Sequence, residues 1–282
     1  MGGGLFGTKM KQLLSLRYRC ALLLVVAARF ASAGLLLDPT GGTSVGFPAN
    51  TPGARVSRDL GGTFRLYGAN ITSINLSSSG FLSTAPFASL LADRSLGELA
   101  SAAAGPVVAP FYDFLAFGDG STVTDLSVAN QYYAATYQSM YGDNDTAAGH
   151  SSDFQVVLFM AATDIGNFHF LPGEIAFSYG NLNSAIFDAS FTVGVAQTQL
   201  NFDGPPASAD GRLSNFSTLP TGSQFILFRP RGIQRIGSPT VFFYESSIES
   251  AESTSAVPEP TSMALFGLGL LALGLKRATR WL

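Results

Sequence analysis

Apolar and polar residues alternate in short segments along most of this 282-residue chain. Successive side chains of a β-strand point to opposite faces, so such alternation places one apolar face against a core. Glycine, proline, asparagine and serine separate the segments and favour turns. The pattern predicts an all-β fold, an antiparallel β-sandwich of roughly ten strands. Representative apolar positions are Phe64, Leu66, Ile74, Leu76, Ile175, Phe177, Tyr179, Phe191, Val193, Val195, Phe225 and Leu227.

Two segments depart from simple alternation. Residues 154–160 are almost continuously apolar, which is typical of a central strand covered on both faces. Residues 95–104 carry Leu96, Leu99 and several alanines at helical spacing. We therefore expect one buried central strand, and one short helix that covers an end of the sandwich.

The N-terminal residues have the composition of a secretory signal peptide. Basic residues precede an apolar run, and small residues follow it in the pattern that signal peptidases cleave. The residues concerned are Lys11, Arg17 and Arg19, the run 21–28, and Ala31 and Ala33. We expect residues 1–33 to be removed by cleavage before Gly34, with translation starting at either Met1 or Met10.

Residues 258–282 form a second trafficking segment. Pro258 and Pro260 cannot continue a helix, so they keep the chain around Glu259 extended. The apolar run 263–275 would form a helix of roughly 20 Å, which is short against a hydrocarbon core of about 30 Å. A basic flank follows this run: Lys276, Arg277 and Arg280. Because such a flank favours the cytoplasmic side, we expect a single short C-terminal transmembrane helix with the preceding chain outside.

The tail, residues 257–280, resembles the PEP-CTERM sorting signal of Gram-negative bacteria. The resemblance rests on Pro258, Glu259 and Pro260, followed by the apolar run and the basic flank. It implies processing by an exosortase, a membrane cysteine transpeptidase, and an association with exopolysaccharide and biofilm. The protein is then expected to cross the inner membrane, to be anchored until it is processed, and to reach the cell surface or extracellular matrix. The fate of the tail after processing is left open.

Removal of both ends leaves an acidic ectodomain. Residues 34–257 contain eight arginines and 18 acidic residues, which gives a net charge of −10. A surface of that sign disfavours nucleic acid and anionic lipid as partners. The single cysteine, Cys20, is lost with the signal peptide, so the mature protein has no disulfide and no thiolate. We expect a β-sandwich over residues 34–244 and a flexible Ser/Glu/Ala-rich spacer over residues 245–257.

Five short motifs of the ectodomain occur in the order found in the nidogen-type (NIDO) domain, which the chain resembles over about residues 61–229. The motifs are residues 74–82, 108–113, 154–159, 173–180 and 192–195. The resemblance implies an extracellular β-sheet module of adhesive or matrix proteins. It brings no established catalytic residues.

Few residues suggest chemistry. His150 and His169 lie in no metal-binding or nucleophile motif, so we expect no enzyme and no cofactor. The carboxylates and amide at residues 143–145 could bind calcium, although an acidic hairpin loop is the simpler interpretation. This weak candidate site comprises Asp143, Asn144 and Asp145. Alternation places Tyr133 and Tyr137 in the core rather than on a sugar-binding surface.

These features predict an exported, surface-retained, non-catalytic protein with a structural or adhesive role in the cell envelope or biofilm matrix. One alternative is a carbohydrate-binding module that holds matrix polysaccharide. Another is a hydrolase that acts on that polysaccharide. The sequence alone does not separate these three functions.

Overall fold

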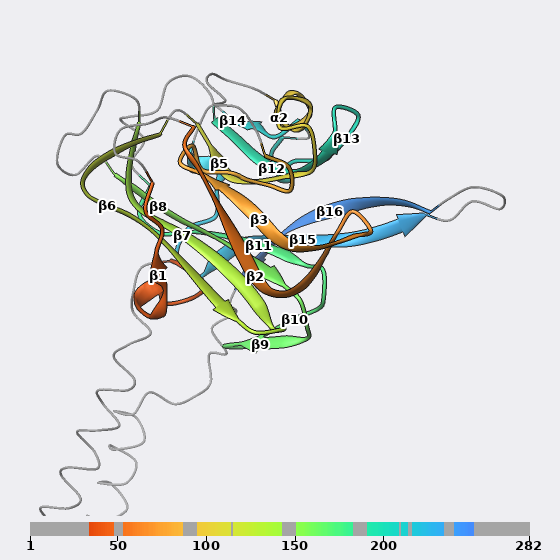
Figure 1. Ribbon diagram of the computed structural model, residues 1–282, viewed down its shortest axis with the longest axis horizontal. Coiled ribbons are helices and arrows are strands. Elements are labelled where there is room, and N and C mark those ends of the chain that lie inside the picture. The colour runs from red at the N-terminus through yellow and green to blue at the C-terminus, as the bar shows by residue number, and fades with distance from the viewer. Residues whose placement is uncertain are drawn as a thin grey trace, which may run out of the picture. The chain divides into compact units, whose positions relative to one another are not determined.

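The computed structural model describes residues 34–47, 53–86, 95–113, 115–142, 151–182, 191–208, 210–213, 216–233 and 240–250. Within them the chain forms two antiparallel β-sheets, a separate two-stranded hairpin and one α-helix (Figure 1). The described residues up to Glu249 belong to one compact unit. The all-β antiparallel fold with a single short helix is thus confirmed for the part of the chain that is described.

The first sheet has seven strands. In spatial order they are β1 (Thr43–Ser44), β6 (Leu115–Val128), β7 (Tyr132–Gly142), β8 (Ser152–Phe159), β11 (Ile175–Tyr179), β15 (Gln224–Ile233) and β16 (Val241–Ser250). The apolar segment at residues 154–160 supplies β8, which lies between β7 and β11 and is buried along almost its whole length. The predicted central strand is therefore confirmed.

The second sheet is also seven-stranded. Its strands are β13 (Asn201–Asp203), β12 (Phe191–Thr198), β5 (Val107–Tyr112), β4 (Leu82–Ser83), β3 (Ala69–Ser77) and β2 (Arg55–Leu66), with β14 (Arg212–Leu213) paired to β12. The smaller elements are β9 (Thr163–Ile165), β10 (Phe168–Phe170), α2 (Leu96–Ala102) and the 3₁₀ turns η2 (Pro39–Gly41) and η3 (Phe216–Thr218).

The main core lies between the two sheets and is rich in aromatic side chains. Phe111 of β5 packs against Phe154 of β8 with ring centroids 5.2 Å apart. Two buried phenols also cross from sheet to sheet: Tyr137 donates a hydrogen bond to the Ser77 carbonyl (2.9 Å), and Tyr179 donates to the Pro110 carbonyl (2.7 Å). These bonds satisfy buried hydroxyls and fix how the two sheets align.

Each sheet has its outer face partly covered. Helix α2 packs on the second sheet, where Leu96 and Leu99 are fully buried. The helix begins with a capping box, in which the Ser95 hydroxyl accepts from the Glu98 backbone and the Glu98 carboxylate accepts from the Ser95 backbone. The helix expected within residues 95–104 is thus confirmed, and the reciprocal cap fixes its start.

The outer face of the first sheet is covered by the β9–β10 hairpin and by the segment at residues 34–37. Gln155 of β8 holds this segment, because its side chain accepts from the Leu37 N–H (2.9 Å) and donates to the Leu37 carbonyl (3.0 Å). It also donates to the Thr136 hydroxyl (2.7 Å), while the Ser178 hydroxyl accepts from the Leu36 N–H (2.9 Å). A buried polar row thus binds the backbone that directly follows the predicted signal cleavage site.

Replacing Gln155 by alanine should lower the free energy of unfolding by about 2 kcal/mol, because both Leu37 backbone groups and the Thr136 hydroxyl lose their partner. Gln224→Ala is the matched control, since Gln224 is exposed at the start of β15. It should change stability by less than about 0.5 kcal/mol. Denaturant unfolding of the two variants measures the difference, and equal losses would contradict a holding role for Gln155.

The predicted spacer at residues 245–257 is partly wrong. Residues 245–250 lie in β16, and only residues 251–257 fall outside the described residues. Residues 245–250 have the polar composition of a linker because β16 is an edge strand. It is stabilised by cross-strand ion pairs rather than by two apolar faces. Arg231 Nε lies 2.9 Å from Glu245 Oε2, and Arg229 Nη2 lies 2.9 Å from Glu249 Oε1.

Among the residues that are described, no helix is long and apolar enough to cross a membrane. The predicted transmembrane segment at residues 263–275 lies outside them.

Candidate functional site

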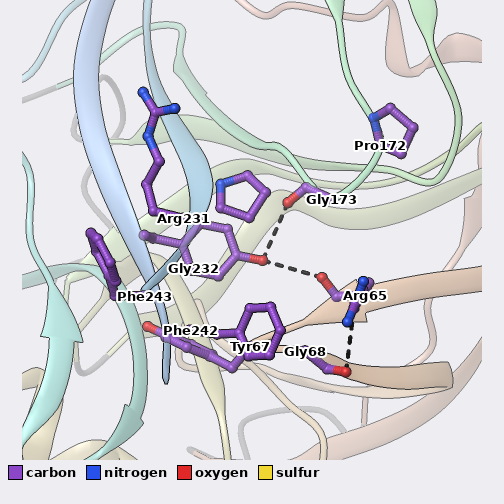
Figure 2. Close-up of a pocket in the computed structure, with 11 residues that line it drawn as sticks. Arg65, Tyr67, Gly68, Pro172, Gly173, Arg231, Gly232, Phe242 and Phe243 are labelled. Atoms are coloured by element: carbon purple, nitrogen blue, oxygen red, sulfur yellow. Dashed lines mark hydrogen bonds between the residues drawn. The ribbon is translucent and has the colours of Figure 1, made fainter. Parts of the chain in front are cut away.

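A pocket of about 180 Å³ opens where three parts of the chain meet (Figure 2). The parts are the β2–β3 turn, the loop between β10 and β11, and the β15–β16 hairpin. Its main lining residues are Arg65, Tyr67, Pro172, Pro230, Phe242 and Tyr244. The pocket thus has mostly aromatic and proline walls, with two arginines among them, Arg65 and Arg231.

The β2–β3 turn brings two of these residues into place. Leu66 pairs with Ala69, so Tyr67 and Gly68 form a two-residue hairpin turn. Both have positive φ (48° and 81°), the combination that a type I′ turn requires. A Cβ atom at Gly68 would overlap the Phe242 ring, so only glycine lets β16 pack this closely against the turn. A bulky residue such as Tyr67 rarely adopts this conformation.

Tyr244 joins all three parts of the pocket. Its phenol oxygen lies 3.2 Å from the Gly173 carbonyl and 3.4 Å from the Arg65 carbonyl, and it donates its proton to this pair of acceptors. Figure 2 draws these bonds as dashed lines that end at the labelled residues Gly173 and Arg65. The Tyr67 and Tyr244 rings meet edge to face with centroids 5.0 Å apart. Burial raises the pKa of Tyr244. The hydroxyl therefore stays protonated and acts as a structural donor rather than as an acid or base.

Arg65 is held but not neutralised. Its guanidinium lies over the Phe242 ring, 5.0 Å from the centroid, and its Nε donates to the Gly68 carbonyl (3.4 Å). In the described part of the chain no carboxylate pairs with it, whereas Arg58, Arg229 and Arg231 each have an acidic partner. The cation–π contact orients the guanidinium and leaves hydrogen-bond donors free to bind an anion.

Two buried polar atoms close to the pocket, the Tyr67 hydroxyl and Asp203 Oδ2, have no hydrogen-bond partner among the residues that the structure describes. Burial raises the pKa of Asp203 to about 6; nearby Glu245 adds to this effect, and a hydrogen bond from the Ser246 backbone opposes it. Burial also raises the pKa of Tyr67, helped by neighbouring Tyr244 and Asp203. Ionised Asp203 is therefore unfavourable in the folded protein.

Asp203→Asn should stabilise the protein above pH 7 and have little effect below pH 4. A folded-state pKa of about 6, against 3.8 for an unperturbed Asp, means that the wild type loses stability as pH rises through 6. We expect a gain of about 1 kcal/mol, because solvent screens this half-buried carboxyl. Thermal melts from pH 3 to 8 measure it.

Asp210→Asn provides a control of opposite sign. A hydrogen bond from the Ser208 hydroxyl lowers the pKa of Asp210, so its carboxylate stabilises the fold above the unfolded-state pKa and loses that effect as pH falls. The substitution should therefore destabilise at neutral pH. Parallel pH profiles for the two variants would contradict the electrostatic interpretation of Asp203.

The structure places His169 on β10, where Nδ1 donates to Asp164 Oδ1 (2.6 Å) and both side chains are exposed. Tyr133 and Tyr137 are fully buried, as predicted. The described residues contain no group of three or more His, Cys, Asp or Glu side chains that could hold a metal ion. The other predicted sites lie outside the described residues: Ala31, Ala33, Asp143, Asn144, Asp145, His150, Pro258, Glu259, Pro260, Lys276, Arg277 and Arg280.

The pocket could not be predicted from the sequence. Its residues come from three separate parts of the chain, at residues 65–68, 172–173 and 230–244, and all of them except Gly173 lie outside the five motifs. One local signal was present, because Tyr67-Gly68 stands between two alternating segments and is a plausible hairpin turn. That signal predicts the turn and says nothing of what packs on it.

Comparison with known families gives two matches. Residues 30–230 match the family described as NIDO related. The matched range includes the segment at residues 34–37 and begins well before residue 61, where the resemblance was expected to start. Residues 256–278 match the PEP-CTERM protein-sorting motif. Both resemblances inferred from the sequence are thereby confirmed. No curated protein and no solved structure matched the chain.

Proposed function

This chain belongs to the NIDO-related family, and on that premise we propose that it is a non-catalytic structural or adhesive protein of the cell envelope or exopolysaccharide matrix. Its sorting motif indicates an exported protein that an exosortase processes on its way to the surface of a Gram-negative bacterium. The observation that carries the proposal is the order of the two matches. A β-sheet domain of an extracellular family is followed, after residues 231–255, by a surface-sorting motif.

The anchoring step is also a proposal. The apolar run 263–275 and the basic residues after it would hold the precursor in the inner membrane until the exosortase acts on the extended segment around Glu259. Anchoring followed by cleavage suits the sequence, because the apolar run is barely long enough to span a bilayer. A short anchor that is later cut needs only temporary stability.

Several features support a non-catalytic role. Among the described residues, the histidine lies in an exposed pair on a small hairpin and does not line the candidate pocket. Burial raises the pKa of Tyr137 and Tyr179, and both hydroxyls donate to backbone carbonyls within the core. Burial of structural phenols thus accounts for these shifts without any need for a reaction.

Cell fractionation and a hydrolysis assay together test this proposal. The protein should appear at the surface or in the matrix with its tail processed, and its removal should weaken the matrix. The purified protein should release no reducing ends from the host's own polysaccharide. Release of reducing ends would support the hydrolase alternative, and an uncut protein in the cytosol would refute the proposed export.

A carbohydrate-binding module is the second candidate. The pocket of Figure 2 favours it, because aromatic and proline walls beside polar donors are common features of ligand sites. On this candidate the protein would hold matrix polysaccharide rather than serve only as a structural element.

A further inference from the structure

The electrostatics of the pocket differ from those of the domain around it. The mature ectodomain carries a net charge of −10, yet no acidic residue is among the described residues that line the pocket. Arg65 contributes a positive charge that the described carboxylates leave unpaired. An acidic protein that keeps one oriented, uncompensated guanidinium in a pocket has a local site suited to an anion.

The walls restrict what that anion can be. Pro172 and Pro230 present C–H surface, and the Phe242 ring packs against the Arg65 guanidinium. The volume of about 180 Å³ is smaller than the roughly 300–1,000 Å³ of pockets that enclose drug-sized ligands. One compact ring with an attached carboxylate fits these limits. A longer anionic segment does not.

We propose that this pocket binds one carboxylate-bearing sugar residue of an acidic polysaccharide. Arg65 pairs with the sugar carboxylate through charge-assisted hydrogen bonds, and the proline walls pack against the C–H face of the ring. This assignment rests on the proposed matrix role and names the chemistry of the polymer that the protein holds. The rest of the acidic surface repels the polymer, so attachment occurs at this local contact.

The structure also explains how the site keeps its shape without a ligand. The Gly68 turn, the Phe242 ring and the Tyr244 hydrogen bonds hold the three segments together. A preformed site loses little conformational entropy when it binds. Weak binding by one site is then multiplied when many copies on one cell contact one polymer.

Ligand-observed NMR titration tests the proposal with the mature protein, exported and purified from a bacterial host. The probes are digalacturonate and the neutral digalactose. Digalacturonate should bind saturably and digalactose should bind at least about tenfold more weakly, because one charge-assisted contact is lost. Arg65→Gln should weaken digalacturonate binding by a similar factor. Arg65→Lys, which keeps the charge without the planar fork, should lie between them.

Arg55→Gln is the matched control, since Arg55 is exposed at the far end of the same strand and changes the net charge equally. It should leave binding unchanged. Melting curves of all variants separate lost binding from lost folding. Equal binding of both probes, binding that is unaffected by Arg65→Gln, or no saturable binding would each overturn the proposal. So would tighter binding of a short peptide with a free C-terminal carboxylate.

These outcomes are distinguishable from failure of the proposed function. If digalacturonate does not bind but the protein still reaches the surface with a processed tail, only the pocket assignment falls. If the native protein stays uncut in the cytosol, the matrix role falls whatever the pocket binds.

Discussion

Replacing Gly80 by alanine should lower the free energy of unfolding by at least about 3 kcal/mol. Gly80 lies in the turn after β3 with φ of +78°, where an L side chain is strained. A Cβ atom there would overlap the Phe111 carbonyl oxygen and lie 3.0 Å from Leu115 Cδ1. The carbonyl belongs to a buried strand of the core, so it has no room to move. Denaturant unfolding of the purified variant measures the loss.

Gly222→Ala separates the two causes. Gly222 also has a positive φ (+72°), but nothing lies within 4 Å of the position where its Cβ would stand. The control should therefore cost only the backbone strain, about 1 kcal/mol. If both variants lose the same stability, overlap with the Phe111 carbonyl is not what makes glycine necessary at position 80.

Changing Pro258 and Pro260 to alanine together should abolish C-terminal processing and leave the uncut protein in the membrane fraction. The prolines lack amide hydrogens and disfavour a helix, so we expect the peptide bonds around Glu259 to be extended and open to the exosortase. With alanines, the helix expected over residues 263–275 can continue towards the N-terminus and enclose those bonds in backbone hydrogen bonds. Mass spectrometry of the mature C-terminus, with fractionation, gives the answer.

A pair of substitutions outside the motif is the control for this variant. Ser253→Ala with Ser255→Ala changes the same number of residues a few positions upstream and should leave processing intact. The same mature C-terminus in the proline variant and the wild type would show that these prolines do not direct the cut.

Much of the fold could be predicted because local pattern and tertiary environment agree. The alternation around Phe177 and Val193 matches strands that direct their large apolar side chains towards the main core. The almost uninterrupted apolar run of β8 matches a strand buried on both faces. The helix at Leu96 combines helical spacing with a Ser95–Glu98 cap, so both local signals specify the same segment.

Prediction failed where stability comes from partners distant in the sequence. Residues 245–250 look like a solvated linker, and only their pairing with β15 makes them a strand. The pocket likewise depends on Tyr244 meeting the Arg65 and Gly173 carbonyls, which no periodicity can show. The sequence also cannot show that the described carboxylates leave Arg65 unpaired, because the chain contains more than enough acidic residues to neutralise every arginine.

The borders of the two sheets have a consequence for a protein displayed in many copies. Four strands lie at the borders of the sheets, and β1 and β13 are very short. The pairing of β2 contains a register shift. Strand β16 is charged, and its Glu245 and Glu249 pair with Arg231 and Arg229. Exposed flat edge strands recruit other chains into continuous sheets, and short length, a register shift and charge are three features that prevent it. Molecules crowded on a cell can therefore stay as separate units instead of polymerising into fibres.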